Sequence, residues 1–241
     1  MKKILIIGLI LILSLGLIGC EQEEEILEIE DANLEEALRD EIAKTDGDLY
    51  VDDFKDLESL SLGGNDISDI SSLADANLES VEELNLSVNN ISDISPLANA
   101  NLENLKQLSL GGNNISDISP LIDASFEDLE SLNLGINNIS DLSPLADTSF
   151  ENLDCLYLSE NNISDISPLI DLHSRKLERL NLGKNNISDI SPLADANLES
   201  LYCLYLRDNE LSSQHIDEYR EDIGDGDVNI NVSPCGESPL E

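Results

Sequence analysis

Basic residues are scarce in this chain of 241 residues, where 12 Lys and Arg stand against 51 Asp and Glu and the formal net charge is −39. Nucleic-acid binding needs a basic surface, so this balance excludes nucleic acid as a partner. It favours cations or a basic protein instead. Tryptophan is absent and aromatic residues make up 3% of the chain, which disfavours a broad stacking surface for sugars or bases.

Catalytic motifs are missing as well. The sequence contains no G-x-S-x-G, H-E-x-x-H, C-x-x-C or phosphate-binding-loop pattern. Its two histidines are His173 and His215, and the repeat register described below places neither of them beside a cysteine. We therefore expect no enzymatic activity and no cofactor.

A repeat of 24 residues dominates what is present. One copy runs from Leu105 to Asp128, LKQLSLGGNNISDISPLIDASFED, and seven copies follow one another from Leu57 without insertion or deletion. One leucine column consists of Leu60, Leu84, Leu108, Leu132, Leu156, Leu180 and Leu204, and a second lies two residues further on. A fixed period of this length predicts a solenoid with one supersecondary unit per period.

The spacing L-x-x-L-x-L-x-x-N resembles the leucine-rich repeat family, and the I-S-D-I-S-P-L that follows, as in Ile115 to Leu121, resembles its bacterial internalin-like subclass. The resemblance implies an α/β solenoid of seven 24-residue coils, with a parallel concave sheet and short helical turns on the convex side. A helical N-terminal cap and a helix–strand C-terminal cap would close its two ends. Such repeats serve many ligands, so the resemblance specifies fold rather than function.

The residues themselves predict the same elements. Leu60-Ser-Leu62 and its equivalents alternate apolar and polar side chains, which is typical of short strands. Ser119 followed by Pro120 predicts an N-cap and the first residue of a short helical turn. We expect the interior of each coil to be filled by Ile115, Ile118, Leu121, Phe126 and their equivalents.

The first 20 residues, MKKILIIGLILILSLGLIGC, predict a lipoprotein signal peptide over 1–20. Two lysines precede an apolar run that is short for a transmembrane span. Leu17 to Cys20 resembles a bacterial lipobox, which implies cleavage before Cys20 and attachment of diacylglycerol to its thiol. The mature chain would then lie outside the cytoplasm, anchored to the cell membrane by lipid. An uncleaved anchor with an incidental cysteine is the alternative.

The remaining chain divides into an acidic tether (21–30), an N-terminal cap (31–56), the repeats (57–211), a C-terminal cap (212–232) and a flexible tail (233–241). Asp31 is expected to cap a helix, with Gly47 after its end and Phe54 covering the core. In the C-terminal cap, a helix over 214–223 and a strand around Ile230 are expected.

Two polar columns accompany the leucines. The asparagine column contains Asn65, Asn89, Asn113, Asn137, Asn161, Asn185 and Asn209, and we expect each amide to bond to backbone groups of adjacent coils as a buried ladder. The aspartate column contains Asp69, Asp93, Asp117, Asp141, Asp165 and Asp189. These carboxylates would form local Asx turns or, alternatively, a file of calcium sites, although no D-x-D-x-D-G loop supports calcium.

The cysteines do not predict a disulfide. Cys155 and Cys203 occupy the same repeat position two coils apart, which places them roughly 9–10 Å apart at the usual strand spacing. That separation exceeds disulfide reach. Cys235 lies in the tail and is the remaining cysteine that could form a disulfide with Cys155 or Cys203.

The concave face changes along the solenoid. Small or polar residues flank the strand leucines in the first four coils, such as Ser61, Asn85 and Gly111. Coils five to seven present Cys155, Tyr157, Arg179, Asn181, Cys203, Tyr205 and Arg207 instead, with Tyr202 beside them. Five bases fall within 175–207, whereas Lys106 is the one base between 56 and 174.

Tyrosine and arginine are enriched at binding hot spots. We therefore predict a ligand-binding patch formed by Tyr157, Arg179, Asn181, Tyr205 and Arg207; drift at exposed positions would produce the same pattern. The sequence thus favours a cell-surface, lipid-anchored binding module or adhesion protein, acting as a monomer on a protein or peptide ligand. The rival interpretation is a structural or calcium-binding acidic envelope protein without a specific partner.

Overall fold

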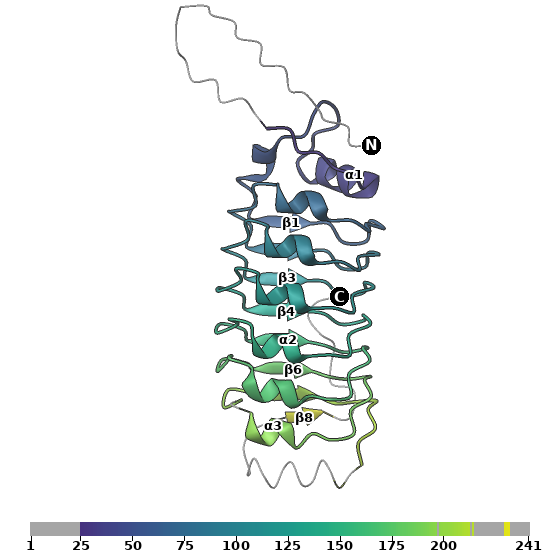
Figure 1. Cartoon of the computed structure of the whole chain (residues 1–241), viewed down its shortest axis with the longest axis vertical. Helices are drawn as coiled ribbons and strands as arrows, with labels where there is room; N and C mark the ends of the chain where they lie inside the picture. The colour runs from purple at the N-terminus through teal and green to yellow at the C-terminus, as the bar shows by residue number, and fades with distance from the viewer. Residues whose placement is uncertain (1–24, 197, 213, 215–228, 232–241) are drawn as a thin grey trace, which may run out of the picture.

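The coils stack into a column whose strands lie side by side (Figure 1). This computed structural model describes residues 25–196, 198–212, 214 and 229–231. The repeat strands are β1 Ser59–Ser61, β2 Glu83–Asn85, β3 Gln107–Ser109, β4 Ser131–Asn133, β5 Cys155–Tyr157, β6 Arg179–Asn181 and β7 Cys203–Tyr205. They form one parallel sheet in chain order, and β8 Asn229–Asn231 extends it beyond β7. The predicted leucine-rich repeat solenoid is confirmed.

The register of the sheet follows the 24-residue period. Leu84 pairs with Leu60 on one side and with Leu108 on the other. All seven central leucines are at most 1% exposed. Because side chains alternate between the two faces of a strand, a slip of one residue would expose this whole column. Apolar burial therefore sets the register as well as stabilising the stack.

The rest of each interior is filled as predicted. In coil three, Ile115, Ile118, Leu121 and Phe126 are at most 2% exposed. The convex side carries the short helices η2 Ser71–Ala74, η3 Ser95–Ala98, η4 Ser119–Ile122, α2 Ser143–Ala146, η5 Ser167–Asp171 and α3 Pro192–Asp195. The predicted helical turns are therefore present.

The capping of these turns differs from the prediction. In coil three Ile118 occupies the N-cap position, and no side chain caps the helix there. Asp117 holds the turn instead, because its Oδ1 accepts the Ser119 N–H at 2.8 Å. The prediction of Ser119 as the capping residue was wrong, since the carboxylate two residues earlier reaches the same N–H.

Helix α1, Ala32–Glu41, closes the N-terminal end of the core. Asp31 is its N-cap, as predicted, and Leu34 and Leu38 are fully buried beneath it. The short helix η1, Val51–Phe54, adds the fully buried Phe54. Gly47 does not follow the helix end directly, because Ala43 already takes the left-handed conformation there, with φ of 53°.

The acidic tether predicted over 21–30 is wrong for its described part. Residues 25–30 belong to the cap: the Leu27 N–H donates to the Leu49 carbonyl at 2.8 Å, and the Val51 N–H donates to the Glu25 carbonyl at 2.8 Å. Leu27 is 4% exposed. Leu27 is buried and Ile29 packs partly against the core, whereas Ile26 is exposed.

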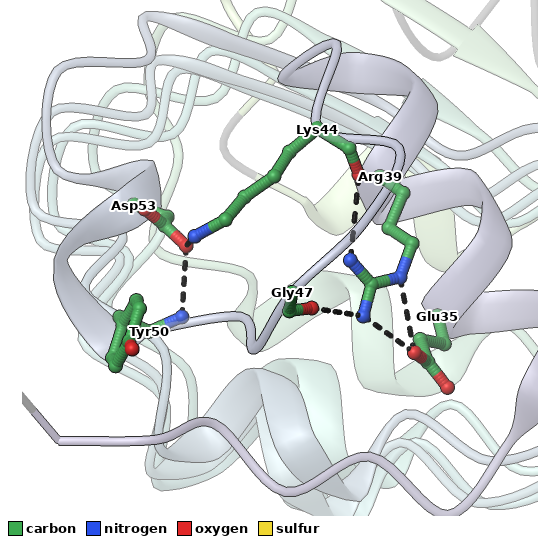
Figure 2. Close-up of polar contacts among 6 residues, drawn as sticks. All are labelled: Glu35, Arg39, Lys44, Gly47, Tyr50 and Asp53. Carbon is green, nitrogen blue, oxygen red and sulfur yellow. Dashed lines mark hydrogen bonds and ion pairs between the residues drawn. The ribbon is translucent and has the colours of Figure 1, made fainter.

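Ion pairs hold the loop after α1 in place (Figure 2). The Arg39 guanidinium lies 2.8 Å from Glu35 and donates to the Gly47 carbonyl at 2.9 Å. The Lys44 ammonium lies 2.7 Å from Asp53. The scarce bases at this end of the chain therefore tie the loop to both helices of the cap.

The C-terminal cap is described only in part. Strand β8 confirms the expected strand around Ile230, whereas the predicted helix over 214–223 and the tail over 233–241 lie outside the described residues. The signal peptide over 1–20, including Cys20, also lies outside them. Within the described ranges, none of the helices has the length and apolar character that crossing a bilayer requires.

Candidate binding surface on the concave sheet

Strands β5, β6 and β7 bring four of the five predicted patch residues together in two cross-strand rows, and Arg207 lies two residues beyond the end of β7. Arg179 pairs with Cys155 on one side and with Cys203 on the other. In the second row, Asn181 pairs with Tyr157 and Tyr205. These alternate positions share the sheet face opposite the buried leucines.

Arg179 is the centre of this surface. Its Nη1 donates to the Cys155 sulfur at 3.1 Å. Its guanidinium carbon also lies 5.5 Å from the ring centroid of Tyr202, within range of a cation–π interaction. The guanidinium is therefore fixed by neighbours on both adjacent coils rather than free in solvent.

The side chains of the patch differ in their exposure to solvent. Tyr157 is only 8% exposed, and the neighbouring Cys155 and Cys203 are 5% and 7% exposed. Tyr157 is therefore not available as a surface anchor, which corrects the prediction for that residue. The register neighbours of Tyr157 on the two adjacent strands are Asn133 and Asn181.

The available groups lie toward coil seven. Tyr202 is 41% exposed, Arg207 is exposed, and Arg179, Asn181 and Tyr205 are half-buried. Arg207 contacts Asp208 of its own turn at 3.1 Å. A ligand at this surface would meet two tyrosines and two guanidinium groups.

Burial changes the protonation chemistry of the covered groups. It raises the pKa of Tyr157 to about 12, and the adjacent Cys155 adds to the rise. Burial also raises the pKa of the Cys155 thiol, with a further rise from Asp154, while Tyr157 and Arg179 act in the opposite direction. A neutral, covered thiol is a poor nucleophile, so this cluster suits binding rather than catalysis.

A depression of about 300 Å³ lies beside the patch, lined by Glu130, Asn152, Asp154, Lys176, Glu178 and Ser200. Its three carboxylates come from the position just before strands β4, β5 and β6. The Lys176 ammonium donates to the Asn152 side chain at 2.6 Å. Sequence reasoning missed this depression, although the acidic column before the strands was visible in the repeat register.

Six of the seven column asparagines form a ladder inside the solenoid. Asn113 is typical: its amide nitrogen donates to the Leu86 and Leu110 carbonyls at 2.9 Å, and its oxygen accepts the Ile91 N–H at 3.0 Å. Asn65 is the exception, because it is exposed and its amide donates to Gly63 of its own coil. Among the described residues, the N-terminal cap rather than another coil precedes Asn65.

The aspartate column forms Asx turns. Each of the six carboxylates accepts the N–H of the serine two residues later at 2.8 Å. The hydrogen bonds from Ser119 lower the pKa of Asp117. Among the described residues, no group of three or more His, Cys, Asp or Glu is arranged to hold a metal ion.

Comparison with known proteins gives the following matches. A family model described as "Leucine rich repeat" matches residues 55–120, and one described as "Leucine Rich repeats (2 copies)" matches 103–147 and 151–195. The crystal structure of internalin C2 from Listeria monocytogenes shares 26% sequence identity with this chain and superposes with a TM-score of 0.59. The match covers 83% of this chain and 92% of the internalin chain.

A leucine-rich repeat protein of Leptospira interrogans is similar in fold, with 23% identity and a TM-score of 0.56 over 75% of this chain and 50% of that one. No curated protein matches this chain.

Proposed function

Because this chain belongs to the leucine-rich repeat family, whose solenoids are generally binding scaffolds rather than enzymes, we propose that it binds a protein or peptide ligand through coils five to seven of its concave sheet. The observation that carries the proposal is Arg179, held between Cys155 and the ring of Tyr202. A guanidinium fixed in this way is preorganised for a ligand and loses little side-chain freedom on binding.

The charges around the patch indicate what such a ligand carries. Arg207 and Arg179 offer donors to a carboxylate or a carbonyl. The neighbouring depression offers the carboxylates of Glu130, Asp154 and Glu178, which suit a basic side chain. A ligand segment with an acceptor and a base a few residues apart fits both features.

A capture experiment tests this function. The immobilised full-length protein is exposed to extracellular and membrane fractions, and retained proteins are identified and their affinities measured. We expect the Tyr202→Ala/Arg207→Ala variant to lose at least tenfold in affinity. The matched control is Ser61→Ala/Asn85→Ala, on the exposed concave face of the first two coils. Equal affinity of both variants would reject the site.

We further propose that the chain is an extracytoplasmic lipoprotein anchored through Cys20. The lipobox-like sequence from Leu17 to Cys20 supports this. The cap already includes Glu25, whose carbonyl accepts the Val51 N–H, so only residues 21–24 separate it from the anchor. The N-terminal cap would then lie close to the membrane, with coils five to seven at the far end of the column (Figure 1). Metabolic labelling with a radioactive fatty acid tests the anchor: label in the wild type and none in Cys20→Ser is the expected result.

A further inference from the structure

One position just after each strand adopts the left-handed conformation in every coil. It is occupied by Gly64, Val88, Gly112, Ile136, Glu160, Lys184 and Asp208, with φ between 53° and 77°. The sheet imposes this geometry: the Val88 N–H donates to the Gly111 carbonyl at 2.7 Å, and the Ile136 N–H donates to the Ser159 carbonyl at 2.8 Å. Any residue placed there must accept the same conformation.

Val88 and Ile136 are the unfavourable choices at this position. Both are β-branched, and branched side chains are strained in the left-handed region. Neither gains burial in return, since Val88 is 68% exposed and Ile136 is 58% exposed. Strain that folding does not require is a sign of a functional contact. The neighbouring Gly112 meets the same backbone demand without strain.

The two aliphatic side chains flank Gly112 on consecutive coils. The strand spacing places their backbones about 10 Å apart. A Cβ added to Gly112 would lie 3.4 Å from Cγ2 of Val88, so the valine leans over the glycine. Val88 therefore covers Gly112, and the two form one apolar surface next to the exposed Ile136.

The surface around this position carries little charge, although strand β2 itself begins with the exposed Glu83. Residues 84–92, 107–116 and 131–140, which run from the strands through these turns, contain no acid and no base, in a chain with 51 acids. The nearest acids of the equivalent segments are Asp66 in coil one and Glu160 in coil five. An uncharged partner surface that stays on coils two to four can therefore cover Val88 and Ile136 while desolvating few carboxylates.

We propose that Val88, Gly112 and Ile136 form a second contact site, which binds an uncharged, aliphatic segment of a protein partner. An aliphatic side chain of that segment packs against the exposed side chains of Val88 and Ile136. The exposed amides of Asn114 and Asn138 bond to the polar backbone around it. Burial of exposed apolar surface supplies the affinity, and the missing charges supply the selectivity.

Panning a library of linear peptides on the full-length protein tests the site. We expect selected peptides to be uncharged with at least one aliphatic residue, and a synthetic copy to bind at least tenfold more weakly to Val88→Gly/Ile136→Gly. The matched control is Ile122→Ala/Ile170→Ala, because these isoleucines are exposed on the convex side at 39% and 36%. That control is expected to bind the peptide normally.

Glycine takes the left-handed conformation without strain, so the Val88→Gly/Ile136→Gly variant is expected to melt at a temperature at least as high as that of the wild type. Weaker binding by this variant then cannot be attributed to unfolding. The Tyr202→Ala/Arg207→Ala variant is expected to bind the peptide normally, which separates this site from the one on coils five to seven. Basic peptides that bind all variants equally would overturn the proposal. The proposal would also be overturned if the wild type self-associated or bound phosphatidylcholine vesicles, and the Val88→Gly/Ile136→Gly variant lost that property.

Discussion

The Asp31 carboxylate accepts hydrogen bonds from both the backbone N–H (2.8 Å) and the hydroxyl (3.0 Å) of Ser68, 37 residues later in the chain. Its other oxygen accepts the N–H groups of Asn33 and Leu34 at the start of α1. One side chain thus caps the helix and joins it to the first coil. Partial burial would raise the pKa of Asp31, but these hydrogen bonds outweigh it and lower the pKa to about 2.

The first prediction concerns acid. Because the pKa of Asp31 is lower in the folded chain than its ordinary value of 3.8, its stabilisation is fully present above pH 4 or so and is lost as pH falls toward 2. We expect Asp31→Ala to lower the free energy of unfolding at pH 7 by about 2 kcal/mol, and by much less near pH 2. Urea unfolding at both pH values measures this. Asp40→Ala, at an exposed acid of the same helix, should change little at either pH.

The asparagine ladder predicts a contrast within one column. Asn113→Ala would strand the buried carbonyls of Leu86 and Leu110 and the N–H of Ile91. We expect it to cost about 2–3 kcal/mol of unfolding free energy. Asn65→Ala, where the side chain is exposed, should cost less than about 0.5 kcal/mol. Equal losses in chemical denaturation would contradict the ladder as a source of stability.

Coil one offers a stabilising substitution. Ser72 stands at the repeat position where five other coils have proline, as at Pro96. Its buried hydroxyl has no hydrogen-bond partner within the described residues. We expect Ser72→Pro to raise the free energy of unfolding by about 1 kcal/mol, because it restricts the unfolded chain and removes that hydroxyl. Ser72→Ala isolates the contribution of the hydroxyl, and a lower melting temperature for the proline variant would refute the prediction.

The Cys155 thiol predicts a pH profile. Burial and Asp154 raise its pKa, whereas Tyr157 and Arg179 lower it. Native Cys155 should therefore react with iodoacetamide far more slowly at pH 8 than in guanidinium, as followed by peptide mass spectrometry. Asp154→Asn should shift the rate profile toward lower pH, and Arg179→Met should shift it toward higher pH. Native alkylation at the rate of the unfolded chain would contradict the described burial.

The N-terminal cap illustrates why local patterns reach only so far. Asp31 before a helix is a local signal, and the helix follows it. The strip from Glu25 to Glu30 reads locally as a polar tether, yet it pairs with residues 49–51 across the cap. That pairing depends on a partner more than 20 residues away, which composition does not reveal.

The 24-residue period by itself determined the solenoid, the inward leucines and the asparagine ladder, because an invariant period places the same residue of every coil in the same environment. Only the tertiary structure decided the environments of the residues that depart from the repeat pattern. Tyr157 is buried between the neighbouring strands that present Asn133 and Asn181. Val88 and Ile136 take a left-handed backbone in turns that inter-coil hydrogen bonds hold in place. Both outcomes depend on contacts between residues one coil apart, which no single copy of the repeat contains.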